Sequence, residues 1–345
     1  MVVMVTGGAG YIGSHAVLAL RRAGYDVVVY DNLSRGFAEA LQGEAFAGVP
    51  LEVGDVGDRR RVREVIDKYG VEAVLHFAAL AQVAESVEQP ARYFRNNTLQ
   101  GLDLVETLLD AGVRTLIFSS TAAVYGEPER VPIPEDHPER PTNPYGRSKL
   151  AFEFILESLA VARGLRYAAL RYFNVAGADP EGQAGERHQP ETHLIPLILA
   201  AALDHHPVRI FGTDYPTPDG TCIRDYVHVT DLVEAHLLAL RKLIEGQPRV
   251  PAVTTAAGVA ETASGGCRLV YNLGSEKGYS VREVIQAAER VIGMPIQTEI
   301  APRRPGDPAV LVASSERIRR ELGWAPRYGL EEMLATAWAW HQAHR

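Results

Sequence analysis

Tyr145 and Lys149 lie four residues apart in the segment Tyr145-Gly-Arg-Ser-Lys149, and Thr121 offers a hydroxyl further upstream. Residues i and i+4 share one face of a helix, so the ammonium of Lys149 is expected near the phenol of Tyr145. A nearby cation favours the phenolate and lowers the pKa of a tyrosine from its usual value of about 10. The sequence therefore predicts that Tyr145 is the catalytic base and acid, assisted by Lys149 and Thr121.

This spacing is common by chance and gains meaning from a glycine fingerprint at the start of the chain. An apolar run, Val2–Val5, is followed at once by glycines and then by an apolar helical pattern through Leu20. That order predicts strand, tight turn and helix, with the pyrophosphate of a dinucleotide at the helix N-terminus. The predicted pyrophosphate site consists of Gly7, Gly10, Tyr11, Ile12 and Gly13.

The strand ends that follow predict the remainder of the cofactor site. Asp31 ends the second apolar run, where a carboxylate binds the adenosine ribose and repels a 2′-phosphate, so we expect NAD rather than NADP. Arg35 nearby keeps the NADP alternative open. Ligands sit at the carboxyl ends of strands in such sheets, which adds further expected cofactor contacts. These are Asn32, Asp55, Val56, Phe77, Ala78 and Ala79.

Strand-like and helical stretches alternate along the chain, which predicts a doubly wound parallel α/β sheet of the Rossmann type. We expect this NAD-binding domain over residues 1–177 and a smaller C-terminal α/β substrate-binding domain over 178–345, with 224–240 packing back on the first. One long helix is predicted over 90–111. The strand Thr115–Thr121 then ends in three hydroxyls, and an irregular loop follows over 127–144.

The composition excludes several classes of function. Of 345 residues, 46% are hydrophobic and 23% charged, and the net charge of −8 argues against nucleic acid as a partner. No segment reaches the ~20 apolar residues of a membrane span, and no basic leader precedes the first strand. The only two cysteines, Cys222 and Cys267, lack metal-like spacing. We expect no metal, no membrane attachment and a cytoplasmic location.

Further motifs carry a family resemblance from Met1 to about Trp340. They include Arg171-Tyr-Phe-Asn174, Arg224-Asp-Tyr-Val-His228, Tyr271-Asn-Leu-Gly274 and Pro302-Arg-Arg-Pro-Gly-Asp307. With the features above, the chain resembles the extended short-chain dehydrogenase/reductase family, and within it the UDP-glucose 4-epimerases. The resemblance implies interconversion of UDP-galactose and UDP-glucose by C4 epimerisation, through a 4-keto sugar and bound NAD, in galactose metabolism. It also implies a homodimer.

The resemblance assigns further residues to the site. Ser119, Asn96 and Phe173 would contact the cofactor together with Tyr145 and Lys149. Arginines suit the UDP diphosphate because a guanidinium is a planar, permanently charged fork. The implied UDP-hexose contacts are Thr121, Asn174, His193, Leu194, Arg209, Phe211, Arg224, Arg304, Asp307 and Leu311.

Three positions depart from the family pattern. Ala81 stands where a lysine is frequent, so one cofactor contact is expected to be lost or replaced. Leu311 stands where some epimerases have a bulky tyrosine, and the smaller side chain leads to the hypothesis that UDP-GalNAc and UDP-GlcNAc are also accepted. The segment 247–268 is longer than the usual connection and has no assigned role.

Two other functions stay open, and so does the role of two long helices. A nucleotide-sugar 4,6-dehydratase or a decarboxylase would use the same fold, but dehydratases place an Asp-Glu pair where this chain has Ala122-Ala123. A non-catalytic NAD-binding protein would usually lack Tyr145 or Lys149. The helical stretches 91–109 and 145–162 are apolar on more than one face, which favours either a four-helix dimer interface or buried core helices.

Overall fold

The computed structural model describes residues 1–245, 266–304 and 307–344, so most of the segment 247–268 lies outside the described residues. A seven-stranded sheet in the order β10-β6-β5-β4-β1-β2-β3 forms its centre, and every pairing in it is parallel. The strands are β1 (Val2–Thr6), β2 (Asp26–Asp31), β3 (Leu51–Val53), β4 (Val71–His76), β5 (Thr115–Thr121), β6 (Arg166–Tyr172) and β10 (Cys267–Leu273).

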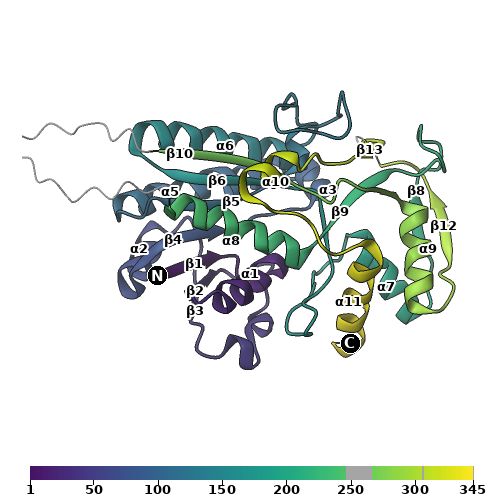
Figure 1. Ribbon diagram of the computed structural model, residues 1–345, viewed down its shortest axis with the longest axis horizontal. Helices are drawn as coiled ribbons and strands as arrows, with labels where there is room; N and C mark the ends of the chain where they lie inside the picture. Colours follow the sequence, from purple (N-terminus) through teal and green to yellow (C-terminus); the bar gives the residue numbers. More distant parts are fainter. Residues whose placement is uncertain (246–265, 305–306, 345) are drawn as a thin grey trace, which may run out of the picture.

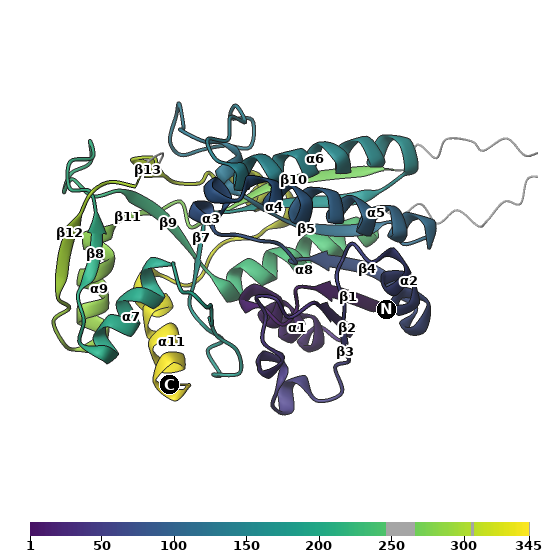
Figure 2. The same ribbon diagram turned by 180° about the vertical axis from the view of Figure 1, so that it is seen from behind.

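Helices cover both faces of this sheet (Figures 1 and 2). On one face lie α1 (Tyr11–Arg22) and α8 (Val229–Glu245), and on the other lie α2 (Arg59–Tyr69), α5 (Gln100–Asp110) and α6 (Pro144–Arg163). Short helices in the connections are η1 (Ala38–Leu41), η2 (Glu44–Phe46), α3 (Val83–Glu88), α4 (Pro90–Tyr93) and η4 (Ala122–Val124).

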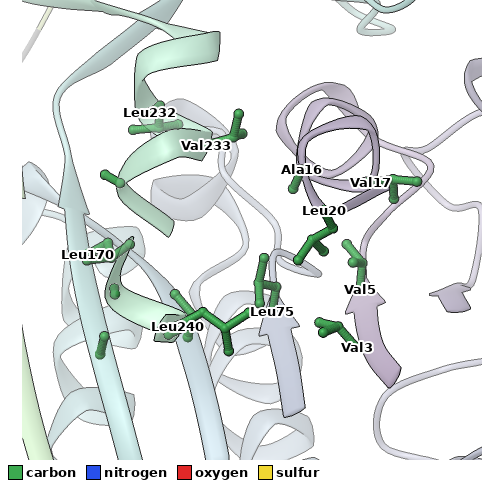
Figure 3. Close-up of a cluster of buried hydrophobic side chains, with 14 of the residues drawn as sticks. Val3, Val5, Ala16, Val17, Leu20, Leu75, Leu170, Leu232, Val233 and Leu240 are labelled. Carbon is green, nitrogen blue, oxygen red and sulfur yellow. The ribbon is translucent and has the colours of Figure 1, made fainter. Parts of the chain in front are cut away.

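Strand alternation divides the buried side chains between two cores. In β1, Val3 and Val5 belong to the core beneath α1 and α8, whereas Met4 belongs to the core beneath α2, α5 and α6. Figure 3 shows Val3 and Val5 beside Leu20 of α1 and Leu75 of β4. Successive strand residues point to opposite faces, so a strand that is apolar throughout must be covered on both sides. The predicted doubly wound Rossmann sheet is confirmed.

The helix predicted over 90–111 is interrupted. Between α4 and α5 the segment η3 (Phe94–Leu99) has π-helical hydrogen bonding, which adds a residue to the turn. Asn97 within it is buried, and its side-chain amide donates to the Leu80 carbonyl at 2.9 Å and to Ser148 Oγ at 3.1 Å. The wider turn therefore ties this segment to the loop after β4 and to α6.

A second lobe has its own hydrophobic cluster, formed chiefly by three helices at the right of Figure 1. Those helices are α7 (Leu194–Asp204), α9 (Val281–Ile292) and α11 (Leu330–Ala343). Its small sheets contain β7 (Asn174–Ala176), β8 (Val208–Phe211), β9 (Ile223–His228), β11 (Gly278–Ser280), β12 (Thr298–Ala301) and β13 (Val310–Leu311). This lobe is the smaller α/β unit expected from the sequence.

After residue 177 the chain returns several times to the layer built around the main sheet. Helix α8 contributes Leu232, Val233 and Leu240 to the same core as β1 and α1, as Figure 3 shows, and β10 supplies the edge strand of the main sheet. Helix α10 (Glu316–Leu322) also contacts this core through Ile318. The division of the chain into domains at residue 177 stays a prediction. Elements from beyond residue 177 complete the first layer, so the two lobes do not correspond to two continuous segments.

Within the described residues, none of the helices combines the length and apolar character that crossing a bilayer requires.

Candidate active site

The hydroxyls of Thr121 and Tyr145 meet where β5 ends and α6 begins. Asn143 caps α6 by accepting the Gly146 N–H at 2.9 Å, and Pro144 occupies the first turn. A Cβ at Gly146 would come within 2.4 Å of the Ala123 carbonyl oxygen, so only glycine allows this approach of α6 to the end of β5. The Thr121 side chain consequently lies close enough to Tyr145 to influence the pKa of its phenol.

Lys149 lies one turn further along α6 and is buried beneath the strand end. Its side chain is 3% exposed, and its Nζ donates to the Ser119 carbonyl at 2.8 Å. Burial lowers the pKa of Lys149 to about 7, while the carboxylate of Glu153 acts in the opposite direction. The structure thus brings together Thr121, Tyr145, Lys149 and Ser119, as the sequence predicted for a single site.

The predicted lowering of the Tyr145 pKa is not found. Burial raises the pKa of Tyr145 above its ordinary value of 10.0, because a phenolate loses its hydration there, and the hydrogen bond with Thr121 only partly opposes this effect. The Lys149 ammonium contacts the Ser119 carbonyl. Sequence spacing places the cation on the correct face of α6 but contains no information about desolvation.

A buried polar network beneath the trio was not predicted. Glu153 of α6 accepts hydrogen bonds from Ser120 Oγ at 2.5 Å and from Arg171 NH2 at 2.6 Å. Arg171, fully buried in β6, also donates to Tyr125 OH at 2.9 Å, and that hydroxyl donates to Asn272 Oδ1 at 2.7 Å. The available signal was Arg171 near the end of a mostly apolar strand, because a buried charge requires a partner.

The loop between β1 and α1 has the geometry of a phosphate site. A Cβ at Gly13 would come within 2.1 Å of the Gly7 carbonyl oxygen, so the helix can turn this tightly only with glycine there. Gly10 is the N-cap of α1, and Tyr11, Ile12 and Gly13 form its first turn. The first turn of a helix presents backbone N–H groups and a positive dipole end. This donor set fits the pyrophosphate of a dinucleotide.

The carboxylate of Asp31 lies beside this loop. Its Oδ2 accepts the Ala9 N–H at 3.0 Å and its Oδ1 accepts the Leu33 N–H at 2.8 Å, while burial raises its pKa. Arg35, whose position kept NADP open, pairs instead with both carboxylate oxygens of Glu85, at 2.8 and 3.0 Å. An acidic group at the end of β2 and an already paired arginine favour NAD.

The other expected cofactor residues lie along the same edge of the sheet. Asn32 Nδ2 donates to Asp55 Oδ2 at 3.2 Å, so the ends of β2 and β3 meet, with Val56 buried beside them. The N–H groups of Phe77 and Ala78 both donate to the Thr6 carbonyl, at 2.9 and 3.1 Å, which places the loop after β4, including Ala79, against the end of β1. Two residues reach this edge from other elements: Asn96 lies in η3, and Phe173 follows β6.

The second lobe contributes a separate group of charged side chains. Arg224 of β9 donates to Asp307 Oδ1 at 2.5 Å, and the Asp307 N–H donates to the Arg304 carbonyl at 3.3 Å. The Arg304 guanidinium lies 4.0 Å from the ring centroid of Phe211. Leu311 of β13 is in register with Arg224 and packs against the cluster that contains Ala122 and Phe173. The residues predicted to bind the diphosphate therefore lie next to the end of β5.

Asp225 holds this group in place and was also missed. It is fully buried, and its carboxylate accepts N–H groups of Ser275 at 2.7 Å, Glu276 at 3.1 Å and Ala313 at 3.0 Å. These residues follow β10 and β13, so one side chain joins β9 to the main sheet. Burial raises the pKa of Asp225 to about 6, with the hydrogen bonds acting in the opposite direction.

Two predicted substrate contacts have other partners here. Arg209 lies on the exposed side of β8 and pairs with Glu299 of β12. The His193 side chain contacts Glu186 Oε1 at 2.8 Å, while its backbone caps α7, which begins with Leu194. Asn174 starts β7, directly after Phe173.

Comparison with known proteins gives matches over the full chain. A family model described as the NAD dependent epimerase/dehydratase family matches residues 3–251. The UDP-glucose 4-epimerase of Halalkalibacterium halodurans is 48% identical over 100% of this chain and 96% of its own length.

Solved structures of similar proteins agree with the fold. The crystal structure of UDP-glucose 4-epimerase from Brucella ovis in complex with NAD has a TM-score of 0.88 and 44% identity, covering 98% of this chain and 97% of that one. The enzyme from Bifidobacterium longum in complex with NAD+ and UDP has a TM-score of 0.90 and 37% identity, covering 99% of this chain and 98% of that one. With a family model that matches residues 3–251 and full-length similarity to these proteins, the chain belongs to the NAD dependent epimerase/dehydratase family.

Proposed function

We infer that the chain catalyses the interconversion of UDP-galactose and UDP-glucose by inverting C4 of the hexose, with NAD as cofactor, in galactose metabolism. The observation that carries this inference is that Thr121, Tyr145 and Lys149 lie together where β5 ends and α6 begins. Full-length relatives at 48% identity bear the name UDP-glucose 4-epimerase, which supports the same reaction.

In this reaction Tyr145 removes the proton of the sugar 4-hydroxyl and later returns it. Thr121 lies beside Tyr145, where its hydroxyl would assist by binding the same 4-hydroxyl. NAD, when bound, would supply a reversible hydride acceptor for C4 of the sugar. The residues that would hold it are those of the β1–α1 loop, Asp31 and Lys149.

The UDP group would be held by the second lobe. The paired guanidinium of Arg224 and the guanidinium of Arg304 offer directed N–H donors to phosphate oxygens. Anchoring the substrate through its nucleotide leaves the hexose with fewer fixed contacts, so the 4-keto sugar can turn. This arrangement is what inversion at C4 requires.

The dehydratase alternative has no support at the catalytic strand. Ala122 and Ala123 directly follow Thr121, and their methyl groups cannot remove a C5 proton or protonate a leaving hydroxyl. The pair Tyr145 and Lys149 is intact, which argues equally against a non-catalytic NAD-binding role.

We also propose a cytoplasmic homodimer. Phe154 and Val161 of α6 are 55% and 80% exposed and lie seven residues apart, on one face of the helix. Leu99, 55% exposed, lies in η3, which packs beside α6. Large apolar side chains that are exposed together favour association with a second copy.

Replacing Tyr145 by Phe is expected to lower kcat by roughly a hundredfold or more, because the proton of the 4-hydroxyl loses its acceptor. The readout is a proton NMR time course of UDP-galactose with NAD, in which wild type forms UDP-glucose without net NADH. NAD binding, followed by fluorescence, should stay nearly unchanged. Tyr25→Phe, at the opposite edge of the sheet, is the matched control, and unchanged turnover in Tyr145→Phe would mean that another group is the base.

The lowered pKa of buried Lys149 predicts a specific pH dependence of the free energy of unfolding. Its pKa is about 7 in the folded chain against the ordinary 10.5, so between these values the unfolded chain binds one more proton and the free energy of unfolding rises with pH. The wild type should gain stability relative to Lys149→Met between pH 7 and pH 9, by up to ~1.4 kcal/mol per pH unit. Urea denaturation of cofactor-stripped protein measures this difference. The exposed Lys242→Met control should show none, and parallel curves for Lys149→Met would contradict the assignment.

Leu311 allows a test of substrate range. We expect the wild type to turn over UDP-GalNAc, because the leucine beside Arg224 leaves room for an N-acetyl group. Leu311→Tyr should lower kcat/KM for UDP-GalNAc by roughly tenfold or more, while UDP-galactose, the internal control, changes little. No turnover of UDP-GalNAc by the wild type would end this hypothesis.

The proposed dimer can be tested by introducing charged side chains at its expected interface. Phe154→Glu combined with Val161→Glu should shift the mass measured by light scattering from two chains to one, because carboxylates would be buried without partners. Ile300→Glu, a 69% exposed position on β12, is the control and should leave the mass unchanged. A double variant that stays dimeric would place the interface elsewhere.

A further inference from the structure

Four side chains from one short stretch converge between the two lobes. Glu186, His188, Glu191 and His193 lie in the connection between β7 and α7, and one potential ligand atom from each lies within 4.8 Å of the others. The Nδ1 atoms of His188 and His193 are 3.1 and 2.8 Å from Glu186 Oε1. The same two nitrogens are 3.6 and 3.3 Å from the carboxylate oxygens of Glu191.

These separations match the edges of a small coordination polyhedron. Zinc binds imidazole nitrogen and carboxylate oxygen at about 2.0–2.2 Å, so neighbouring ligands of a tetrahedral site are about 3.3 Å apart. The four measured distances, 2.8, 3.1, 3.3 and 3.6 Å, bracket that value. The His–His and Glu–Glu ligand atoms lie within 4.8 Å of one another, so all four groups are near enough to be drawn around one ion.

The donor set and its burial select the class of ion. Two imidazoles with two carboxylates suit a divalent transition metal, whereas calcium and magnesium prefer oxygen ligands throughout. The Glu186 side chain is only 4% exposed and its carboxylate faces both histidine nitrogens, so a metal ion bound there would take over from the histidines as its partner. His193, at 49% exposed, leaves the cluster open to solvent on one side, which gives an ion a path of entry.

We propose that Glu186, His188, Glu191 and His193 form a binding site for a divalent transition-metal ion, of which Zn²⁺ is the best match. Cysteine spacing predicted no metal, whereas the pattern Glu-x-His-x-x-Glu-x-His over 186–193 is the signal for this site. The proposal does not depend on the proposed reaction.

The position of the cluster indicates what a bound ion would do. The His188 ring packs edge-on against Tyr11 of α1, with centroids 6.3 Å apart, and the Pro190 carbonyl accepts a hydrogen bond from Gln82 at 3.3 Å. His193 is the residue before α7. One ion would therefore fix the connection between β7 and α7 where it packs against α1 and Gln82, in a structural role.

The first experiment titrates untagged, chelator-stripped protein with Zn²⁺ against a chromophoric chelator. We expect one Zn²⁺ per chain in wild type and an affinity lower by roughly tenfold or more in His188→Gln. The matched control is His206→Gln, an exposed histidine just beyond α7, which should bind as wild type does. Zn²⁺ should also raise the melting temperature of wild type and of the control, but not that of His188→Gln.

X-ray absorption at the zinc edge keeps the proposal testable on wild type alone. A shell of nitrogen and oxygen at about 2.0–2.2 Å supports the site. A sulfur shell would assign the metal to Cys222 or Cys267 and overturn the proposal. Equal affinity in His188→Gln and His206→Gln, or no stoichiometric binding by folded wild type, would overturn it as well. If His188→Gln fails to fold, Glu191→Gln replaces it.

Discussion

The position of α6 along β5 is the constraint on which the catalytic site depends. The buried pair Arg171–Glu153 fixes it, since Glu153 also accepts the hydroxyl of Ser120 in β5. Removing one partner of a buried ion pair leaves an uncompensated charge and typically costs about 3–5 kcal/mol. Two further contacts act along the same helix, from Lys149 to the Ser119 carbonyl and from Asn97 to Ser148. Tyr145 reaches Thr121 because the whole helix is held in this register.

The second lobe is attached to this arrangement by another buried carboxylate. Asp225 collects backbone N–H groups that follow β10 and β13, and its neighbour Arg224 is thereby directed toward Asp307. The guanidinium is oriented by the protein before any ligand binds, so less side-chain entropy is lost on binding. The Arg224–Asp307 pair and the trio Thr121, Tyr145 and Lys149 are thus positioned by two separate polar cores.

Much of the fold and part of the site followed from local patterns. The apolar runs gave the parallel sheet, and the need for glycine at Gly13 is a short-range steric matter visible in the sequence. Other features depend on contacts that sequence separation hides. The pKa of Tyr145 is set by burial, the partner of Arg209 lies 90 residues away, and the Arg171 network joins four elements. The interruption at η3 depends on Asn97, whose partners lie in two other segments.

The chain returns repeatedly to the main sheet, and this limits how a whole lobe could be exchanged between related proteins. Elements of the second half alternate between lobes: α8 and β10 pack in the first, β11 and α9 in the second, and α10 again contacts the first core. Among the described residues, the chain therefore passes between the two lobes at several points. A chimera that took its substrate lobe from a relative would need a junction at each crossing, so variation in substrate range arises more readily from point changes than from recombination of domains.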